Sequence, residues 1–248
     1  MKAFSNLLAD LILTSSRNRK LSLLVDYFKS TPDPDRGYAL AALTGSLNFK
    51  NIKASFFKEI IKERQDEYLF DLSYDYVGDL AETVSLLWDQ KKEGDMPSIT
   101  SLFKSLTTVK NDELKRNVTN ILDISTADQR WAFIKLFTGG LRIGVSSRLV
   151  KQALANYGNV NLEEIEKIWH GLHLPYIDLF SWLENKGSKP KISIYDIFHP
   201  MMLAHPLVIE KDLLNANPKN FIAEYKWDGI RVQIVSHSEG CRLYSRTG

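Results

Sequence analysis

The chain has 248 residues, of which 44% are hydrophobic and 25% are charged. These proportions are ordinary for a globular protein and exclude an intrinsically disordered chain. The net charge of +2 at pH 7 is too small to indicate a polyanionic partner, so such a partner can be argued only from the distribution of the charges.

The cysteine count and the hydropathy pattern indicate the cellular compartment in which the protein is expected. The single cysteine, Cys241, cannot form an internal disulfide, which favours a reducing compartment over a secreted scaffold. No run of residues approaches the roughly 20 apolar residues that a transmembrane helix needs. We therefore expect a cytoplasmic protein that has no membrane partner.

The first two hundred residues are predicted to be almost entirely helical. Apolar residues at helical spacing predict helices over the ranges 4–12, 21–28, 38–45, 56–61, 76–88, 102–106 and 114–122. The basic run Arg17–Lys20 is expected to separate the first two helices. Thr31–Pro34 should end the second, with Asp33 as a possible cap for the third. The helix over 76–88 is expected to end near Gly94.

The next helix has clear signals at both ends. Thr126 and Gln129 have the Thr-x-x-Gln form of a capping box, which predicts a helix start. The pair Gly139-Gly140 should end this helix. After a short loop, Ser146 or Ser147 is expected to cap the following helix.

The loop over residues 139–146 is a candidate phosphate-binding site. The N-terminus of a helix exposes unpaired N–H groups and a partial positive charge, and glycines let the backbone approach a ligand closely. Between Gln129 and Leu162 there is no Asp or Glu, whereas the basic residues there are Arg130, Lys135, Arg142, Arg148 and Lys151. An ordinary turn between helices, with glycine as the C-cap and an uneven surface charge, is the alternative interpretation.

Further helices are predicted over 162–170 and 177–183, after which the composition changes. From Phe221 onward the apolar residues alternate with a period of two, which is typical of strands. We predict two domains, over residues 1–198 and 199–248. The spacing of His170, His173, His199 and His205 does not match a metal site, so no metal ligand is predicted among them.

A charged cluster interrupts this strand pattern. Two strands should meet at a turn at Gly229, with Glu224, Lys226 and Asp228 on one face, and a third strand should follow over 242–244. A lysine amine attacks phosphorus only when it is neutral, which requires desolvation or a cationic neighbour such as Arg231. The alternative is an exposed hairpin with a surface ion pair.

Four segments resemble ATP-dependent DNA ligases. Lys226-Trp227-Asp228-Gly229-Ile230-Arg231 resembles their Lys-x-Asp-Gly-x-Arg motif, and Ser245-Arg246-Thr247-Gly248 resembles their Ser-Arg-x-Gly motif. The segment 139–145, Gly-Gly-Leu-Arg-Ile-Gly-Val, resembles the Arg-Ile-Gly loop of their helical DNA-binding domain. The segment 198–206 resembles the Pro-Met-Leu-Ala start of their catalytic domain.

The resemblance implies roles for individual residues. Lys226 is expected to be the catalytic residue that forms a covalent lysyl-AMP, and Glu224 is expected to contact the adenine. Arg231 and Arg246 are expected to contact the nucleotide or the phosphate of the nicked strand. The residues expected at the backbone of duplex DNA are Arg142, Gly144, Arg148 and Lys151.

The fold class expected from the pattern and the resemblance is mainly α. An all-helical DNA-binding domain is followed by the first strands of an α+β nucleotidyltransferase domain. Three strands cannot enclose ATP, so we expect an N-terminal portion of a ligase that is inactive alone. The resemblance implies ATP and Mg²⁺ as cofactors, nicked double-stranded DNA as substrate, and a monomer acting in DNA replication, repair or recombination. The alternatives are a DNA-binding module without catalytic activity and a helical scaffold that binds protein.

Overall fold

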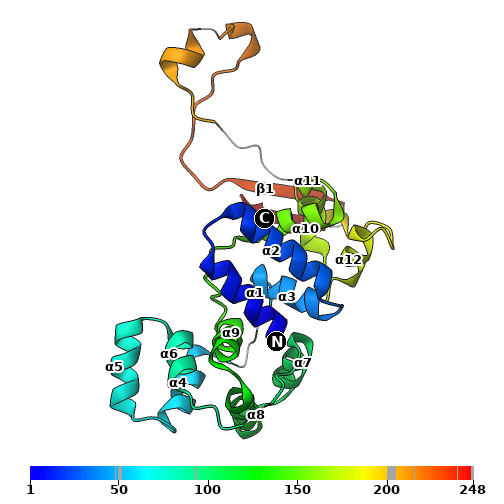
Figure 1. The fold of residues 1–248 in the computed structure, drawn as a ribbon. Helices are drawn as coiled ribbons and strands as arrows, with labels where there is room; N and C mark the ends of the chain where they lie inside the picture. The colour runs from blue at the N-terminus through cyan, green and yellow to red at the C-terminus, as the bar shows by residue number, and fades with distance from the viewer. Residues whose placement is uncertain are drawn as a thin grey trace. The chain divides into compact units, whose positions relative to one another are not determined.

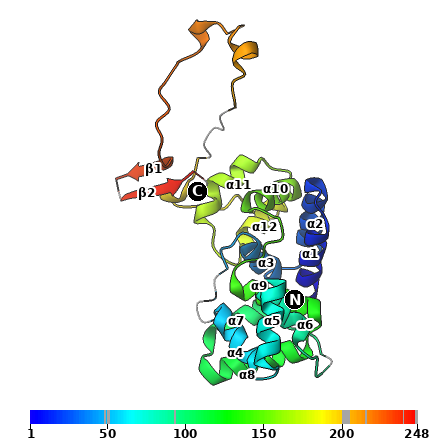
Figure 2. The same ribbon diagram turned by 90° about the vertical axis from the view of Figure 1, so that its left-hand side faces the viewer.

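The computed structural model, drawn in Figure 1 and turned in Figure 2, describes residues 1–47, 49, 52–92, 94–199, 205–214, 216–238 and 240–246. The chain divides into two compact units. The helical unit comprises Met1–Leu162 and His173–Lys189, and the C-terminal unit comprises Glu163–Leu172 and Pro190–Gly248. The division predicted between residues 198 and 199 stays a prediction.

The two units differ in secondary structure. The helical unit contains α1 (Lys2–Leu13), α2 (Arg17–Ser30), α3 (Asp35–Leu43), α4 (Ala54–Lys62), α5 (Glu67–Val77), α6 (Leu80–Leu87), α7 (Ile99–Thr108), α8 (Asn111–Ile124), α9 (Ala127–Thr138), α10 (Ser147–Gly158) and α12 (Ile177–Leu183). Most of α11 (Leu162–Ile168), the short helical turns η1 (Trp169–Gly171), η2 (Ile194–Asp196), η3 (Ile209–Leu213) and η4 (Pro218–Asn220), and the strands β1 (Val232–His237) and β2 (Gly240–Ser245) belong to the C-terminal unit. The predicted fold class, mainly α with a few strands near the end, is confirmed.

Two helices organise the core of the helical unit. Helix α9 packs between α1 and α6, as Figure 1 shows, and its Phe133 and Ile134 side chains are fully buried. Helix α10 packs against α2, α3 and α12. Between these helices the rings of Phe28 and Phe180 lie 5.6 Å apart. Full burial of such a side chain contributes about 1.5–3 kcal/mol, so these apolar faces hold the helices together.

The helix ends that the sequence marked most clearly are confirmed. Thr126 Oγ1 accepts the N–H of Gln129, and Gln129 Oε1 accepts the N–H of Thr126, which completes the capping box. Helix α9 ends at Gly139, whose φ is 75°. Ser146 caps α10 by accepting the N–H of Leu149 at 3.2 Å.

Three predicted helix boundaries were wrong. The basic run Arg17–Lys20 is the first turn of α2, because Ser16 caps the helix there and arginine and lysine are good helix formers. The helix predicted over 76–88 is divided, since Gly78 has a φ of 72° and Asp79 accepts the N–H of Glu82 to start α6. Helix α6 also ends at Leu87 rather than near Gly94, because the backbone is extended at Trp88.

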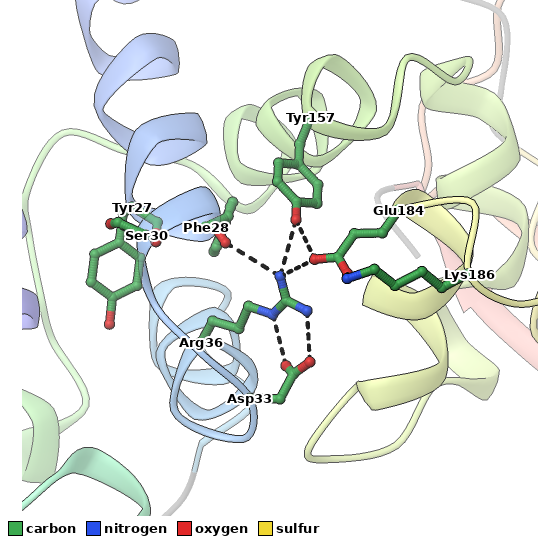
Figure 3. Close-up of polar contacts among 8 residues, drawn as sticks. All are labelled: Tyr27, Phe28, Ser30, Asp33, Arg36, Tyr157, Glu184 and Lys186. Carbon is green, nitrogen blue, oxygen red and sulfur yellow. Dashed lines mark hydrogen bonds and ion pairs between the residues drawn. The ribbon is translucent and has the colours of Figure 1, made fainter.

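Asp33 does not cap α3 but belongs to a partly buried ionic network around the buried Arg36 (Figure 3). Arg36 binds both carboxylate oxygens of Asp33, at 2.7 and 2.6 Å, and also donates to Tyr157 on α10 and to Glu184 just after α12. Lys186 approaches the second oxygen of Glu184 at 2.7 Å. These hydrogen bonds, from Arg36 first and then from Lys186 and Tyr157, lower the pKa of Glu184 to about 2. The network therefore ties the start of α3 to the ends of α10 and α12.

The C-terminal unit contains one antiparallel hairpin. Strand β1 pairs with β2 from Val232 opposite Ser245 to His237 opposite Gly240. Tyr244 is buried, and its ring lies 4.9 Å from the ring of His170 and 5.6 Å from that of Phe198. These contacts hold the hairpin against the short helical turns of its own unit.

One of the three predicted strands does not form. The two later strands are confirmed as β1 and β2, but residues 221–228 have no regular secondary structure. In the described part of the chain no strand lies beside this segment, so no ladder of hydrogen bonds is available to its backbone. The face that was to carry Glu224, Lys226 and Asp228 is therefore not formed.

Candidate functional site

The loop that joins α9 to α10 has an unusual backbone. Gly139, Arg142 and Gly144 all have left-handed φ angles, of 75°, 47° and 65°. Glycine adopts this conformation readily, but for a residue with a side chain it costs on the order of 1–3 kcal/mol. Such strain persists only where surrounding contacts impose it, which makes the contacts of this loop informative.

A lysine from α2 supplies those contacts. Lys20 Nζ donates to the carbonyl oxygens of Ile143 and Gly144, both at 3.0 Å, and the Lys20 side chain is buried. The ammonium lies so close to the loop that a Cβ atom added to Gly144 would be 2.5 Å from Nζ. A buried charge is stable only when it is paired or hydrogen-bonded, so Lys20 and the two carbonyl groups hold one another in place.

The predicted DNA-contacting residues differ in exposure. Arg142, Gly144 and Arg148 are exposed, whereas Lys151, one turn further along α10, is buried. Arg142 and Gly144 line an open pocket of about 510 Å³, together with Val145, Ser146 and Leu149. Ser15, Arg17 and Lys20, around the start of α2, line the same pocket.

The stretch between Gln129 and Leu162, which contains no Asp or Glu, exposes fewer positive charges than the sequence suggests. Arg130 is buried and donates to the carbonyl oxygen of Trp88. Lys135 is also buried and forms an ion pair with Asp79. These two cations therefore hold helices together, and of the basic residues in this stretch only Arg142 and Arg148 have exposed side chains.

Sequence reasoning missed Lys20 and Arg17. The sequence predicted that Lys20 lies between the first two helices. In the structure it lies four residues before the buried Leu24 and therefore on the apolar stripe of α2. A lysine on such a stripe needs an acceptor inside the protein, and this was the available signal. Arg17 is exposed in the first turn of α2 and faces the same pocket.

The residues of the predicted nucleotidyl-transfer motifs are exposed. Glu224, Lys226, Arg231 and Arg246 all lie on the surface, and the structure shows no hydrogen bond or ion pair between these side chains and any described residue. The structure therefore does not bring them together. Thr247 and Gly248, the end of the Ser-Arg-x-Gly motif, and residues 200–204, the centre of the segment 198–206, lie outside the described residues.

No metal or membrane feature is present in the part of the chain that the structure describes. Within it, no group of three His, Cys, Asp or Glu side chains could hold a metal ion. No described helix is both long and apolar enough to cross a bilayer. The sole cysteine, Cys241, is a free and exposed thiol.

The geometry supports two different kinds of chemistry. The 139–146 loop presents a fixed backbone and the exposed guanidinium group of Arg142, and α10 adds its capped N-terminus and the exposed Arg148. This arrangement is suited to oxyanions such as phosphate. The segment 221–231 presents a lysine amine that could attack phosphorus, but Lys226 and its neighbours are exposed to solvent.

Comparison with known proteins bears on both regions. Residues 1–155 match the family model described as DNA ligase N terminus, and residues 201–248 match the model described as ATP dependent DNA ligase domain. The first match covers the helices from α1 to the greater part of α10, including the 139–146 loop. The second includes Lys226 and the hairpin.

Curated relatives align along almost the whole chain. A probable DNA ligase of Koribacter versatilis (strain Ellin345) is 24% identical over 250 residues, which cover 94% of this chain and 42% of the relative. The DNA ligase of Nitrosopumilus maritimus (strain SCM1) is 25% identical, covering 94% of this chain and 44% of the relative. The DNA ligase of Monkeypox virus is 23% identical, covering 99% and 45%. The chain thus spans less than half of the length of these relatives.

Proposed function

Because the chain belongs to the ATP-dependent DNA ligase family, we propose that it binds nicked double-stranded DNA through the 139–146 loop. We also propose that Lys226 is the residue that becomes adenylated in a longer protein, meaning one in which this chain is joined to the rest of the family's catalytic domain. The observation that carries the proposal is the loop itself. Its backbone is held in a left-handed conformation by a buried lysine, and it presents Arg142 to solvent.

The loop is suited to contacts with the phosphate backbone. Arg142 in the loop and Arg148 in the first turn of α10 carry planar donor groups that match phosphate oxygens, and the N-terminus of α10 adds a partial positive charge. Contacts of this kind fix the position of a protein on a duplex without reading its sequence. This suits an enzyme that must seal nicks in any sequence.

Lys226 is assigned as the nucleophile on the strength of the family motif. The proposed step forms a bond between Lys226 Nζ and the α-phosphorus of ATP, breaks the bond to pyrophosphate and releases a proton from the amine. Lys226 is exposed and the described residues form no cluster of metal ligands, so by themselves they do not fit an ATP–magnesium complex. We therefore propose adenylation, with ATP and Mg²⁺, only for a longer protein of the kind defined above.

A DNA-binding module without catalytic activity is the second candidate for this chain. It is favoured by the exposure of Lys226 and of the arginines expected to serve it. A scaffold that binds only protein would be indifferent to DNA, whereas the proposal requires binding to nicked duplexes. Monomeric state, cytoplasmic location and a role in replication, repair or recombination are part of the proposal and rest on the sequence alone.

Labelling with ATP distinguishes these candidates. This chain and the longer protein are each incubated with α-labelled ATP and Mg²⁺, and covalent label is measured after denaturation. We expect label on the longer protein, its loss in Lys226→Ala, and its retention in the matched control Lys219→Ala, since Lys219 is an exposed lysine of the same unit. The proposal fails if Lys226→Ala in the longer protein is labelled or seals nicks as the parent does.

A further inference from the structure

Helix α5 exposes an apolar face to solvent. Tyr68, Leu72 and Tyr76 are 73%, 51% and 93% exposed, and they recur at intervals of four residues, which places them along one stripe of the helix. Leu69 extends the exposed apolar surface on one side. Exposed large apolar side chains are normal singly, but a contiguous group marks an interaction site.

The apolar stripe lies opposite the side by which α5 is attached. Phe70 is fully buried, its ring stacks on Tyr74 with centroids 6.0 Å apart, and Lys58 of α4 lies 4.2 Å above the Tyr74 ring. At about 100° per residue, Tyr68 and Leu72 each lie roughly half a turn away from Phe70. A surface helix ordinarily places its charged residues on the side opposite its buried face. In α5 that opposite side carries Tyr68 and Leu72, so the helix has two apolar sides.

Carboxylates border the exposed stripe. Glu67, Asp71 and Asp75 also recur at intervals of four residues, and α5 contains no Lys, Arg or His. Lys62 of α4 approaches Glu67 at 2.8 Å and Asp71 at 3.1 Å, which compensates part of this charge. Asp75 is exposed beside Leu72 and Tyr76.

The charge decides between possible occupants. A row of carboxylates repels the phosphates of DNA, so this face is not an extension of the DNA-binding loop. A second copy docking the same face would bring two rows of carboxylates together. A basic helix with its own apolar stripe matches both features, because its apolar residues cover the stripe and its lysines or arginines reach the carboxylates.

We propose that the face formed by Tyr68, Leu72, Tyr76, Asp71 and Asp75, here named the α5 face, docks a basic amphipathic helix of a partner protein. Figure 1 shows α5 at the edge of the helical unit, with α4 and α6 on its inner side.

The test places a photoreactive amino acid at position 72 of the full-length protein, in cells that make it naturally. Position 13, where Leu13 is 83% exposed on α1, is the control. Support requires that position 72 crosslinks to a protein segment with net positive charge and helical apolar spacing. A synthetic peptide of that segment must then bind this chain at least about tenfold more weakly after Leu72→Ser or Asp75→Lys.

Matched variants and folding measurements complete the test. The same peptide should bind Leu13→Ser and Asp10→Lys as it binds the parent, since both residues are exposed on α1. Circular dichroism must show unchanged helix content in every variant. The proposal is overturned if position 72 crosslinks mainly to DNA, to a second copy or to a segment without positive charge, or no more than position 13 does. Equal affinity of the peptide for Leu72→Ser and the parent would also overturn it.

Discussion

The 139–146 loop and the segment 221–231 both carry motifs of the ligase family, yet their surroundings differ. The loop has a backbone that Lys20 fixes through two hydrogen bonds, at the start of a helix packed into the core. The segment around Lys226 is exposed, and its charged side chains form no hydrogen bond or ion pair with another described residue. The backbone of a binding loop can thus be fixed by contacts within one unit. A nucleophilic lysine, in contrast, needs neighbouring groups that desolvate it or lower its pKa.

The physical basis of the difference is the number of chain segments that each task requires. Holding a phosphate backbone takes a few exposed donors on a rigid support, which α2, α9 and α10 provide. Making a lysine amine nucleophilic requires desolvation and cationic neighbours from several directions. The described residues supply the first arrangement and not the second.

Limited proteolysis should show this difference as the largest effect. We expect trypsin to cleave after Lys226 and Arg231 roughly a thousandfold or more faster than after Arg142, because cleavage in the loop requires local unfolding of packed structure. Mass spectrometry of fragments over time measures both rates. Similar cleavage rates at the two sites would contradict the claim that the loop is held more rigidly than the segment 221–231.

Arg36→Ala should destabilise the helical unit that supports the loop. Removing Arg36 leaves two partly exposed carboxylates, those of Asp33 and Glu184, without their buried cation, a change that costs up to about 3 kcal/mol. Urea unfolding followed by circular dichroism measures the loss. Arg19→Ala, which removes an exposed arginine of α2, is the control and should change the free energy of unfolding by less than about 0.5 kcal/mol. A loss for Arg36→Ala as small as that of the control would contradict the role given to the network.

The network around Arg36 should make the free energy of unfolding depend on pH. Because the pKa of Glu184 is lowered from 4.5 to about 2, its ionised form stabilises the fold above pH 4.5. That stability is lost as the pH falls from 4.5 through 2, and it amounts to at most about 3 kcal/mol. Glu184→Gln should therefore have a lower free energy of unfolding at pH 7 and a shallower decline in acid. If the two proteins declined in parallel, the lowered pKa would not be a source of stability.

Lys20→Met tests the loop itself and should have the smallest effect of these substitutions. Without the ammonium, the carbonyl groups of Ile143 and Gly144 lose their donor, and the loop no longer has one preferred conformation. We expect affinity for nicked DNA to fall about tenfold, equivalent to about 1.4 kcal/mol. Lys29→Met removes an exposed lysine of the same helix and should have little effect, which separates positioning from net charge. Equal losses in both variants would mean that Lys20 acts only through its charge.

Local signals in the sequence predicted the parts of the fold that local contacts determine. The capping box at Thr126, the stop at Gly139 and the cap at Ser146 each depend on residues three or fewer positions away. For the same reason the two paired strands could be recognised from their alternation. The split at Gly78 was missed, because apolar spacing continues across it into α6.

Contacts between distant residues could not be predicted in this way. Lys20 bonds residues more than 120 positions along the chain, and Arg36 reaches Tyr157 and Glu184. Burial of Arg130 and Lys135 likewise depends on helices far away in sequence. Resemblance to the family pointed to Lys226 and Arg142 as candidate site residues. Only the structure showed that the backbone around Arg142 is held by Lys20, whereas Lys226 is exposed.

Binding of this chain to nicked duplex DNA over a range of salt concentrations tests the central claim most directly. The account predicts that the logarithm of the affinity falls linearly with the logarithm of the salt concentration. Each phosphate contact contributes about 0.9 to the slope, so Arg142→Ala/Arg148→Ala should reduce the slope by about 2 and weaken binding to unrelated sequences alike. A double variant with the affinity and the slope of the parent would contradict the assignment of the 139–146 loop to DNA.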